Sequence, residues 1–157
     1  MRRSNIAILL AAGLTTAAVA PVPGQASATE EMRAVAARAI TWSDANVQGF
    51  APGMKMAVIQ GNPAEAGPYT LRLSFPSGYR FPAHWHPMAE NLTVLSGTFQ
   101  LATGDRVDDS KLKVYTAGDY VFMPATMPHF GSVRGFTVVQ LHGEGPFKIN
   151  LAGSASK

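Results

Sequence analysis

The sequence predicts one all-β domain, either a barrel or a sandwich. Short runs of β-branched and aromatic residues recur from Pro52 onward, and glycine and proline separate them. The run at residues 69–75 alternates cleanly, with apolar Leu71, Leu73 and Phe75 separated by polar residues. A chain of 157 residues is long enough for one domain with a proper core. We see no internal repeat and no second domain.

Ten strands are expected in the barrel region, each ended by a turn signal such as Pro76-Ser-Gly78 or Ala117-Gly118. They cover residues 55–60, 69–75, 80–86, 91–96, 98–102, 113–115, 120–123, 130–133, 136–142 and 147–151. This many short strands with such turns is typical of a closed or nearly closed β architecture.

The first 28 residues have the features of a secretory signal peptide. Arg2 and Arg3 form a positive start, residues 6–20 are apolar, and Ala26-Ser27-Ala28 is a cleavage signal. The apolar run is short and rich in alanine and glycine, which argues against an uncleaved membrane anchor. We therefore expect a periplasmic or secreted protein with no stable anchor after processing. The arginine pair leaves both general secretion and twin-arginine export open.

The mature chain is expected to begin near Thr29 with an N-terminal arm at residues 29–51. Residues 29–40 are rich in alanine, with Thr29 as a possible cap and two glutamates in the first turn, so a short helix and a frayed arm are both open. Barrel residues 52–151 follow, and residues 152–157 form a C-terminal tail.

Two histidines and a glutamate predict a metal site. On a strand, side chains two residues apart point to the same face, so His84 and His86 can reach one ion. Glu90, after a short turn through Pro87, can reach the same ion from the next strand. His129 ends a second block punctuated by glycine and proline that begins at Gly118. Three imidazoles and one carboxylate suit a divalent first-row transition metal (Zn, Fe, Mn, Cu or Ni) better than Ca or Mg.

Both blocks resemble the two sequence motifs of the cupin superfamily. In the first, Gly78, His84, His86, Glu90 and Gly97 fall at the expected places. In the second, Gly118, Pro124 and His129 match, whereas Thr126 and Val133 replace a glycine and an asparagine. The resemblance covers roughly residues 52–151. It implies a small single-domain cupin with a double-stranded β-helix (jelly-roll) barrel and one metal held by His84, His86, Glu90 and His129.

The composition excludes several classes of function. The chain has no cysteine, so disulfides and thiol chemistry are impossible. Removal of Arg2 and Arg3 leaves eleven basic against ten acidic residues, and no basic run interleaves with aromatic residues. We therefore expect no nucleic-acid partner. A homodimer is suggested only by analogy with cupins.

Strand parity predicts which side chains face the barrel interior. If His84, His86 and Glu90 point inward, Leu92 and Val94 do so as well and form an apolar floor. Trp85 then points away from the metal. Gln140 and His142 share a strand face and are pocket candidates for substrate hydrogen bonds or acid/base chemistry. Arg80, with the parity of His84, is a candidate clamp for an anionic substrate, although an exposed cation at the rim is equally compatible.

The resemblance supports two hypotheses for function. The first is a metal-dependent enzyme acting on a small organic acid, sugar or aromatic compound by oxygenase, isomerase or lyase chemistry. The alternative is a non-catalytic metal- or ligand-binding and sensing module, because the sequence also looks like the cupin part of zinc-binding anti-sigma factors. Fold analogy alone cannot choose between them.

Overall fold

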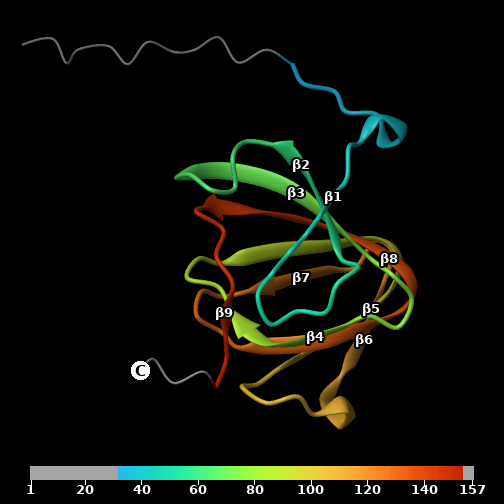
Figure 1. The fold of residues 1–157 in the computed structure, drawn as a ribbon, viewed down its shortest axis with the longest axis vertical. Helices are drawn as coiled ribbons and strands as arrows, with labels where there is room; N and C mark the ends of the chain where they lie inside the picture. Colours follow the sequence, from blue (N-terminus) through green and yellow to red (C-terminus); the bar gives the residue numbers. More distant parts are fainter. Residues whose placement is uncertain (1–31, 154–157) are drawn as a thin grey trace, which may run out of the picture. The chain divides into compact units, whose positions relative to one another are not determined.

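Two long antiparallel strands, at residues 90–103 and 129–145, form the centre of the sheet. The structure is a computed structural model that describes residues 32–153. The predicted signal peptide and the last four residues of the tail lie outside the described residues. The described residues from Ala34 onward group as one compact unit. In its described part, nine antiparallel strands curl around a common interior (Figure 1). The prediction of an all-β fold is therefore confirmed.

The strands and two 3₁₀ turns follow each other along the chain in this order: η1 (Ala37–Ala39), β1 (Ser43–Asp44), β2 (Lys55–Gln60), β3 (Gly67–Phe75), β4 (Arg80–Trp85), β5 (Glu90–Thr103), η2 (Asp109–Lys111), β6 (Lys113–Thr116), β7 (Tyr120–Met123), β8 (His129–Gly145) and β9 (Asn150–Leu151). Neighbours in the sheet run β1-β2-β3-β8-β4-β9, and β5 pairs with β6, β7 and β8. Among residues 32–153, no helix is long and apolar enough to cross a membrane.

Two pairs of predicted strands are each one bent strand in the structure. Residues 91–96 and 98–102 both belong to β5, and residues 130–133 and 136–142 both belong to β8. Gly97, at a φ of 81°, lies at the bend of β5, where the register with β8 shifts. A Cβ at Gly97 would lie 2.4 Å from the carbonyl oxygen of Phe136, so only glycine lets the two strands approach this closely.

An irregularity in β4 changes which side chains face inward. The register between β4 and β8 shifts between Phe81 and His84. Phe81 and His84 both line the interior although they are three residues apart, whereas Ala83 packs in a separate cluster on the other side of the sheet. Extra residues in a strand invert the alternation beyond them. Parity counted back from His84 is therefore wrong for the start of β4.

The interior is a nearly continuous apolar core. Leu71, Val139 and Leu141 are at most 1% exposed, and Leu92 and Val94 are also buried within the same core, as parity predicted. A smaller cluster of Ala83, Ala102 and Phe130 lies outside the barrel wall, where Leu112 and Ala152 pack against it. The residue that follows η2 and the start of the C-terminal tail thus help to cover this side of the sheet.

From Met32 onward, the N-terminal arm joins the sheet and contains no α-helix, whereas the possible cap Thr29 and the two glutamates of the expected first turn lie outside the described residues. From Met32 to Ile40 the only helical element is η1, which has no side-chain cap and no buried residue. Without a buried face, an alanine-rich segment has little to stabilise a helix. Farther along, β1 pairs with β2, and the hydroxyl group of Tyr79 donates a hydrogen bond of 2.6 Å to the carbonyl oxygen of Ala51. These contacts hold the arm against the barrel.

Candidate metal centre

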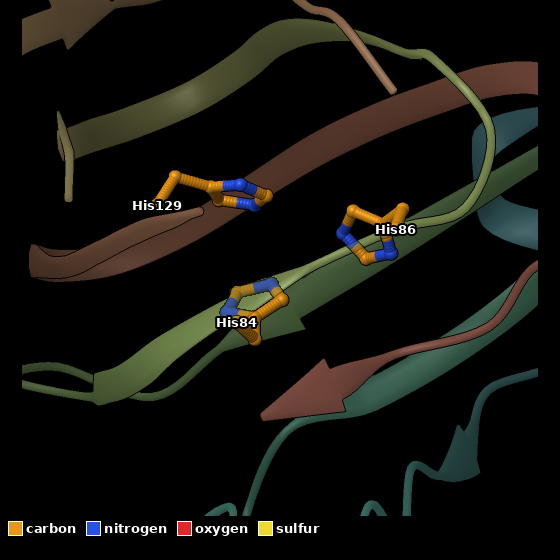
Figure 2. Close-up of side chains that lie close together, drawn as sticks. All are labelled: His84, His86 and His129. Atoms are coloured by element: carbon orange, nitrogen blue, oxygen red, sulfur yellow. The ribbon is translucent and has the colours of Figure 1, made fainter. Parts of the chain in front are cut away.

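Three histidines from two neighbouring segments meet inside the barrel. His84 lies near the end of β4, His86 follows the last residue of that strand, and His129 is the first residue of β8. His84 and His129 are paired in the sheet register. Figure 2 shows the three rings turned toward a common space. Each offers one ring nitrogen, and these nitrogens all lie within 4.8 Å of one another.

Glu90, the first residue of β5, lies beside this cluster. Its Oε2 atom is 3.5 Å from the Nε2 atom of His86 and 3.8 Å from the Nε2 atom of His129. All four side chains are buried, with exposures of 3–6%. The carboxylate and the three imidazoles therefore face each other away from bulk water.

Main-chain carbonyl groups fix the orientation of each histidine ring. The Nδ1 atoms of His84, His86 and His129 lie 2.8, 2.7 and 3.0 Å from the carbonyl oxygens of Pro82, Lys148 and Met127. A carbonyl oxygen only accepts hydrogen bonds, so each Nδ1 must be the protonated, donating nitrogen. In the neutral ring, the Nε2 atom then keeps a free lone pair.

Burial favours the neutral form of every group in the cluster. Desolvation lowers the pKa of His84 to about 3 and that of His86 to about 4, and it lowers the pKa of His129 as well. Desolvation also raises the pKa of Glu90 from 4.5 to about 8. With neutral imidazoles, the short distances from Glu90 to the two histidines are not ion pairs in the metal-free protein.

The four residues fit a transition-metal ion. Three neutral imidazole lone pairs and one carboxylate make up a donor set that first-row divalent ions favour. The Nε2 atom of His86 is the only buried side-chain nitrogen or oxygen among residues 32–153 that lacks a hydrogen-bond partner. A buried, unpartnered lone pair costs stability unless a ligand uses it. The four side chains lie close together in the structure. Their roles as metal ligands remain predictions.

The cluster opens onto a partly open cavity of about 380 Å³ inside the barrel. Its walls are mainly apolar and include Phe81, Phe99, Leu92 and Leu141. Cavities of this size and character are typical of small-molecule sites. A donor set at the end of such a cavity differs from a closed structural site, which has no room beside the metal.

Three predicted pocket residues lie elsewhere. Gln140 and His142 point away from the cavity because Val139 and Leu141, which alternate with them on β8, fill the interior. Neither residue lines the cavity and His142 is exposed, so the prediction of an inward face for these two residues is wrong.

Arg80 is also outside the cavity. Its guanidinium group donates a short hydrogen bond to the carboxylate of Asp109, and more than half of each side chain is exposed. The irregularity in β4 explains why parity with His84 gave the wrong face. The alternative of an exposed cation matches the structure, and Arg80 cannot clamp a ligand in the cavity from this position.

Sequence reasoning missed the residues that cover the cluster from the arm and the C-terminal segment. The ring of Phe50 meets His84 edge-on, with centroids 5.1 Å apart, and the ring of Phe147 stacks on His86 at 4.9 Å. Val47 and Ile149 line the same cavity. Val47 and Phe50 lie in an irregular segment of the arm that gave no periodic signal. Phe147 and Ile149 alternate within the predicted strand at residues 147–151, but alternation does not show which side chains a strand faces across the barrel.

Comparison with protein families gives one assignment. A family model described as the ChrR cupin-like domain matches residues 31–148, about three quarters of the chain. The match includes all four residues of the candidate metal centre and the arm residues that line the cavity. A search of curated proteins finds no match.

Several solved structures share the fold. The polyketide cyclase RemF from Streptomyces resistomycificus superposes with a TM-score of 0.66 at 16% identity, over 80% of this chain and 89% of that chain. A cupin 2 conserved barrel domain protein from Rhodopseudomonas palustris gives 0.57 at 13%, over 71% and 77%. The DMSP lyase DddQ from Ruegeria pomeroyi DSS-3 gives 0.54 at 19%, over 69% and 57%. At these identities the likeness shows the jelly-roll fold alone.

Proposed function

The chain belongs to the ChrR cupin-like domain family. We propose that it is a mononuclear metal-dependent enzyme acting on a small organic molecule. His84, His86, Glu90 and His129 would hold the metal. One observation carries the proposal: three oriented Nε2 lone pairs and a carboxylate converge at the end of an apolar cavity with room for a ligand. Solved structures of cupin fold that are named as a cyclase and a lyase support an enzymatic role.

The residues of the centre divide the chemical work. A bound divalent ion would supply Lewis-acid or dioxygen chemistry, which is compatible with oxygenase, isomerase or lyase reactions. The Glu90 carboxylate would offset one of its positive charges. The histidines would bind it as neutral donors, with the Nδ1 protons held by main-chain carbonyls. The apolar walls would limit water near a bound metal and so strengthen polar contacts there.

A second candidate is a metal- or ligand-binding module without turnover. Among the described residues that line the cavity, none outside the metal centre is a histidine, lysine, tyrosine, serine or threonine. The cavity therefore offers little acid/base chemistry beyond the metal and the carboxylate of Asp44 in the arm. This sparse polar lining favours a binding role if no reaction is found.

Metal analysis of matched histidine variants tests the proposed centre. The mature protein would be purified without chelator from its native compartment, beside His129→Ala and His142→Ala. His142 is the matched control because it is exposed on β8 and outside the cavity. We expect about one equivalent of a transition metal in the wild type and in His142→Ala, and a clear loss in His129→Ala. Equal metal in both variants would contradict the proposed ligand set.

The identity of that metal would direct the search for activity. Iron or manganese would favour oxygen-dependent or lyase reactions, whereas zinc or copper would make iron-dependent oxygenation untenable. Turnover that is lost in His129→Ala and kept in His142→Ala would establish the enzyme. Tight ligand binding with no turnover would favour the binding module.

We also propose export to the periplasm or beyond, because residues 1–28 carry the predicted signal features. N-terminal sequencing of the protein from a periplasmic extract should give a start near Thr29. An intact N-terminus beginning at Met1 would contradict processing at this site.

A further inference from the structure

The walls of the barrel cavity restrict what the protein can bind. We propose that its ligand is a largely hydrocarbon, uncharged molecule of about two rings that carries one oxygen donor at the end near the histidine cluster. This inference rests on the proposed function for the metal contact. The apolar character of the ligand skeleton follows from the cavity lining and does not require a metal.

The side chains of the wall set the chemistry of the ligand skeleton. The cavity is lined by five phenylalanines together with leucine, methionine, valine and isoleucine side chains. Phe75, Phe99 and Leu101 are 3–4% exposed, so this wall is a fixed part of the core and not a surface that water can reshape. Contact with such a wall favours binding only where the ligand also presents an apolar surface to it.

The described lining of the cavity contains no lysine and no arginine. The arginines of the neighbouring strands are directed elsewhere, because Arg80 pairs with Asp109 and the Nε atom of Arg72 donates to the side-chain oxygen of Gln140. In the arm part of the lining, Asp44 is already paired at 2.8 Å with the ammonium group of Lys55. A carboxylate, a phosphate or a sulfonate placed away from the histidine cluster would therefore be buried without a partner.

A sugar or polyol is excluded by the same wall. Each buried hydroxyl group needs a hydrogen-bond partner, and the lining offers polar side chains only at the metal centre and at Asp44 and Asn46 of the arm. Every additional hydroxyl group left without a partner should weaken binding roughly tenfold. One oxygen donor near the histidines is compatible with the lining, whereas a ring of hydroxyl groups is not.

The volume sets the size of the ligand. An apolar cavity of roughly 150 Å³ holds benzene. The present cavity of about 380 Å³ is some two and a half times larger, which corresponds to roughly two fused rings. The aromatic rings of Phe50 and Phe147, which contact His84 and His86, give a flat unsaturated skeleton favourable ring contacts close to the metal centre.

Calorimetric titration with three compounds tests the inference on metal-loaded and metal-free protein. 2-Naphthol has the proposed skeleton and one oxygen, 2-naphthol-6-sulfonate adds one charge remote from that oxygen, and gluconate is the hydrophilic acid. We expect 2-naphthol to bind at least about a hundredfold more tightly than the other two, because the sulfonate and the hydroxyl groups would be buried unpaired. Tighter binding of gluconate or of the sulfonate would overturn the inference.

Neighbouring valines on β8 locate the binding site. Val139 is fully buried and lines the cavity, whereas Val138 lies on the other face of the same strand. Val139→Phe should weaken 2-naphthol binding at least tenfold, and Val138→Phe should change it less than twofold. If Val139→Phe does not fold, Met56→Trp fills the cavity from the half-buried side of β2. Equal effects of the inward and outward variants would overturn the assignment.

A variant that introduces a positive charge should shift the affinities for the naphthol and its sulfonate in opposite directions. Met56→Lys would place an ammonium group in the wall, and it should strengthen binding of 2-naphthol-6-sulfonate at least tenfold while weakening that of 2-naphthol. No gain for the sulfonate would contradict the claim that a missing cation excludes anions.

Metal analysis of the same samples separates the two proposals. Binding of 2-naphthol that depends on Val139 in a protein that takes up no metal would support the apolar ligand and refute the metal centre. One equivalent of metal with a preference for gluconate would support the metal centre and refute the apolar ligand.

Discussion

Replacing Glu90 with glutamine should stabilise the metal-free protein and weaken its hold on the metal. Burial raises the pKa of this carboxyl group from 4.5 to about 8, so the folded protein favours the protonated form. The stability that this preference gives is fully present below pH 4.5 and is lost as the pH rises toward 8. Glutamine has nearly the same shape and does not titrate, so it escapes this loss.

The size of the effect follows from the two pKa values. Each pH unit above 4.5 costs the folded wild type about 1.4 kcal/mol, until the pKa of about 8 is reached. At pH 7 the metal-free Glu90→Gln protein should therefore be more stable by about 3 kcal/mol. The buried histidines titrate in both proteins, so their contributions cancel in the difference.

Urea unfolding in the presence of a chelator, at pH 5.5, 6.5, 7.5 and 8.5, measures this difference. Glu144→Gln is the matched control, because that glutamate is exposed on β8 and does not line the cavity. With saturating metal the order should reverse, since only the wild type offers a carboxylate to the ion. A difference in stability between Glu90→Gln and wild type that stays constant from pH 5.5 to 8.5 would show that burial does not raise the pKa of Glu90.

Three further predictions concern stability at acid pH, the bend of β5 and the exposed Arg80. Burial lowers the pKa values of His84 and His86 in the folded protein to about 3 and 4, so the stability that these histidines contribute is present above pH 6.5 and is lost as the pH falls. The Glu90 carboxyl group has the opposite trend, so the urea midpoint of the metal-free protein should peak near pH 6.5. A midpoint that rises steadily down to pH 5 would contradict this. Gly97→Ala should cost roughly 2 kcal/mol more in chemical unfolding than Gly118→Ala, because both residues have positive φ but only the first would clash with main chain; equal costs would argue against the close strand contact. Arg80→Ala should lower the free energy of unfolding by less than about 1 kcal/mol and leave the metal content unchanged, because the ion pair between Arg80 and Asp109 is exposed. Loss of metal in this variant would show that Arg80 contributes to the metal centre.

The sequence allowed the strands and most of the candidate centre to be predicted, because both depend on local spacing. Alternation placed Leu92 and Val94 in the core, and the spacing of His84 and His86 brought both rings to one side. The second block supplied His129, whose pairing with β4 completes the cluster. The strands and the common side of His84 and His86 needed only the period of a strand and the turns between strands, whereas the inclusion of His129 rested on the resemblance of its block to the second cupin motif.

The errors arose where the structure depends on contacts that spacing cannot show. Arg80 was misplaced because the irregularity in β4 inverts the alternation. Gln140 was misplaced because the choice between the two faces of β8 depends on which residues pair across the barrel. The contribution of Phe50 required knowing that the arm folds back over strands far away in the sequence. The predicted ligand roles and the export signal remain predictions.

The main-chain carbonyl groups that hold the three Nδ1 atoms have a consequence for how the protein can diversify. No substitution removes a carbonyl oxygen, so changes in the cavity wall leave the three imidazoles oriented as long as the strand ends keep their path. Changes in ligand preference can therefore leave the proposed metal ligands undisturbed within one small barrel. New binding specificities can accumulate residue by residue on the walls, while the centre that would carry the chemistry is preserved by the backbone.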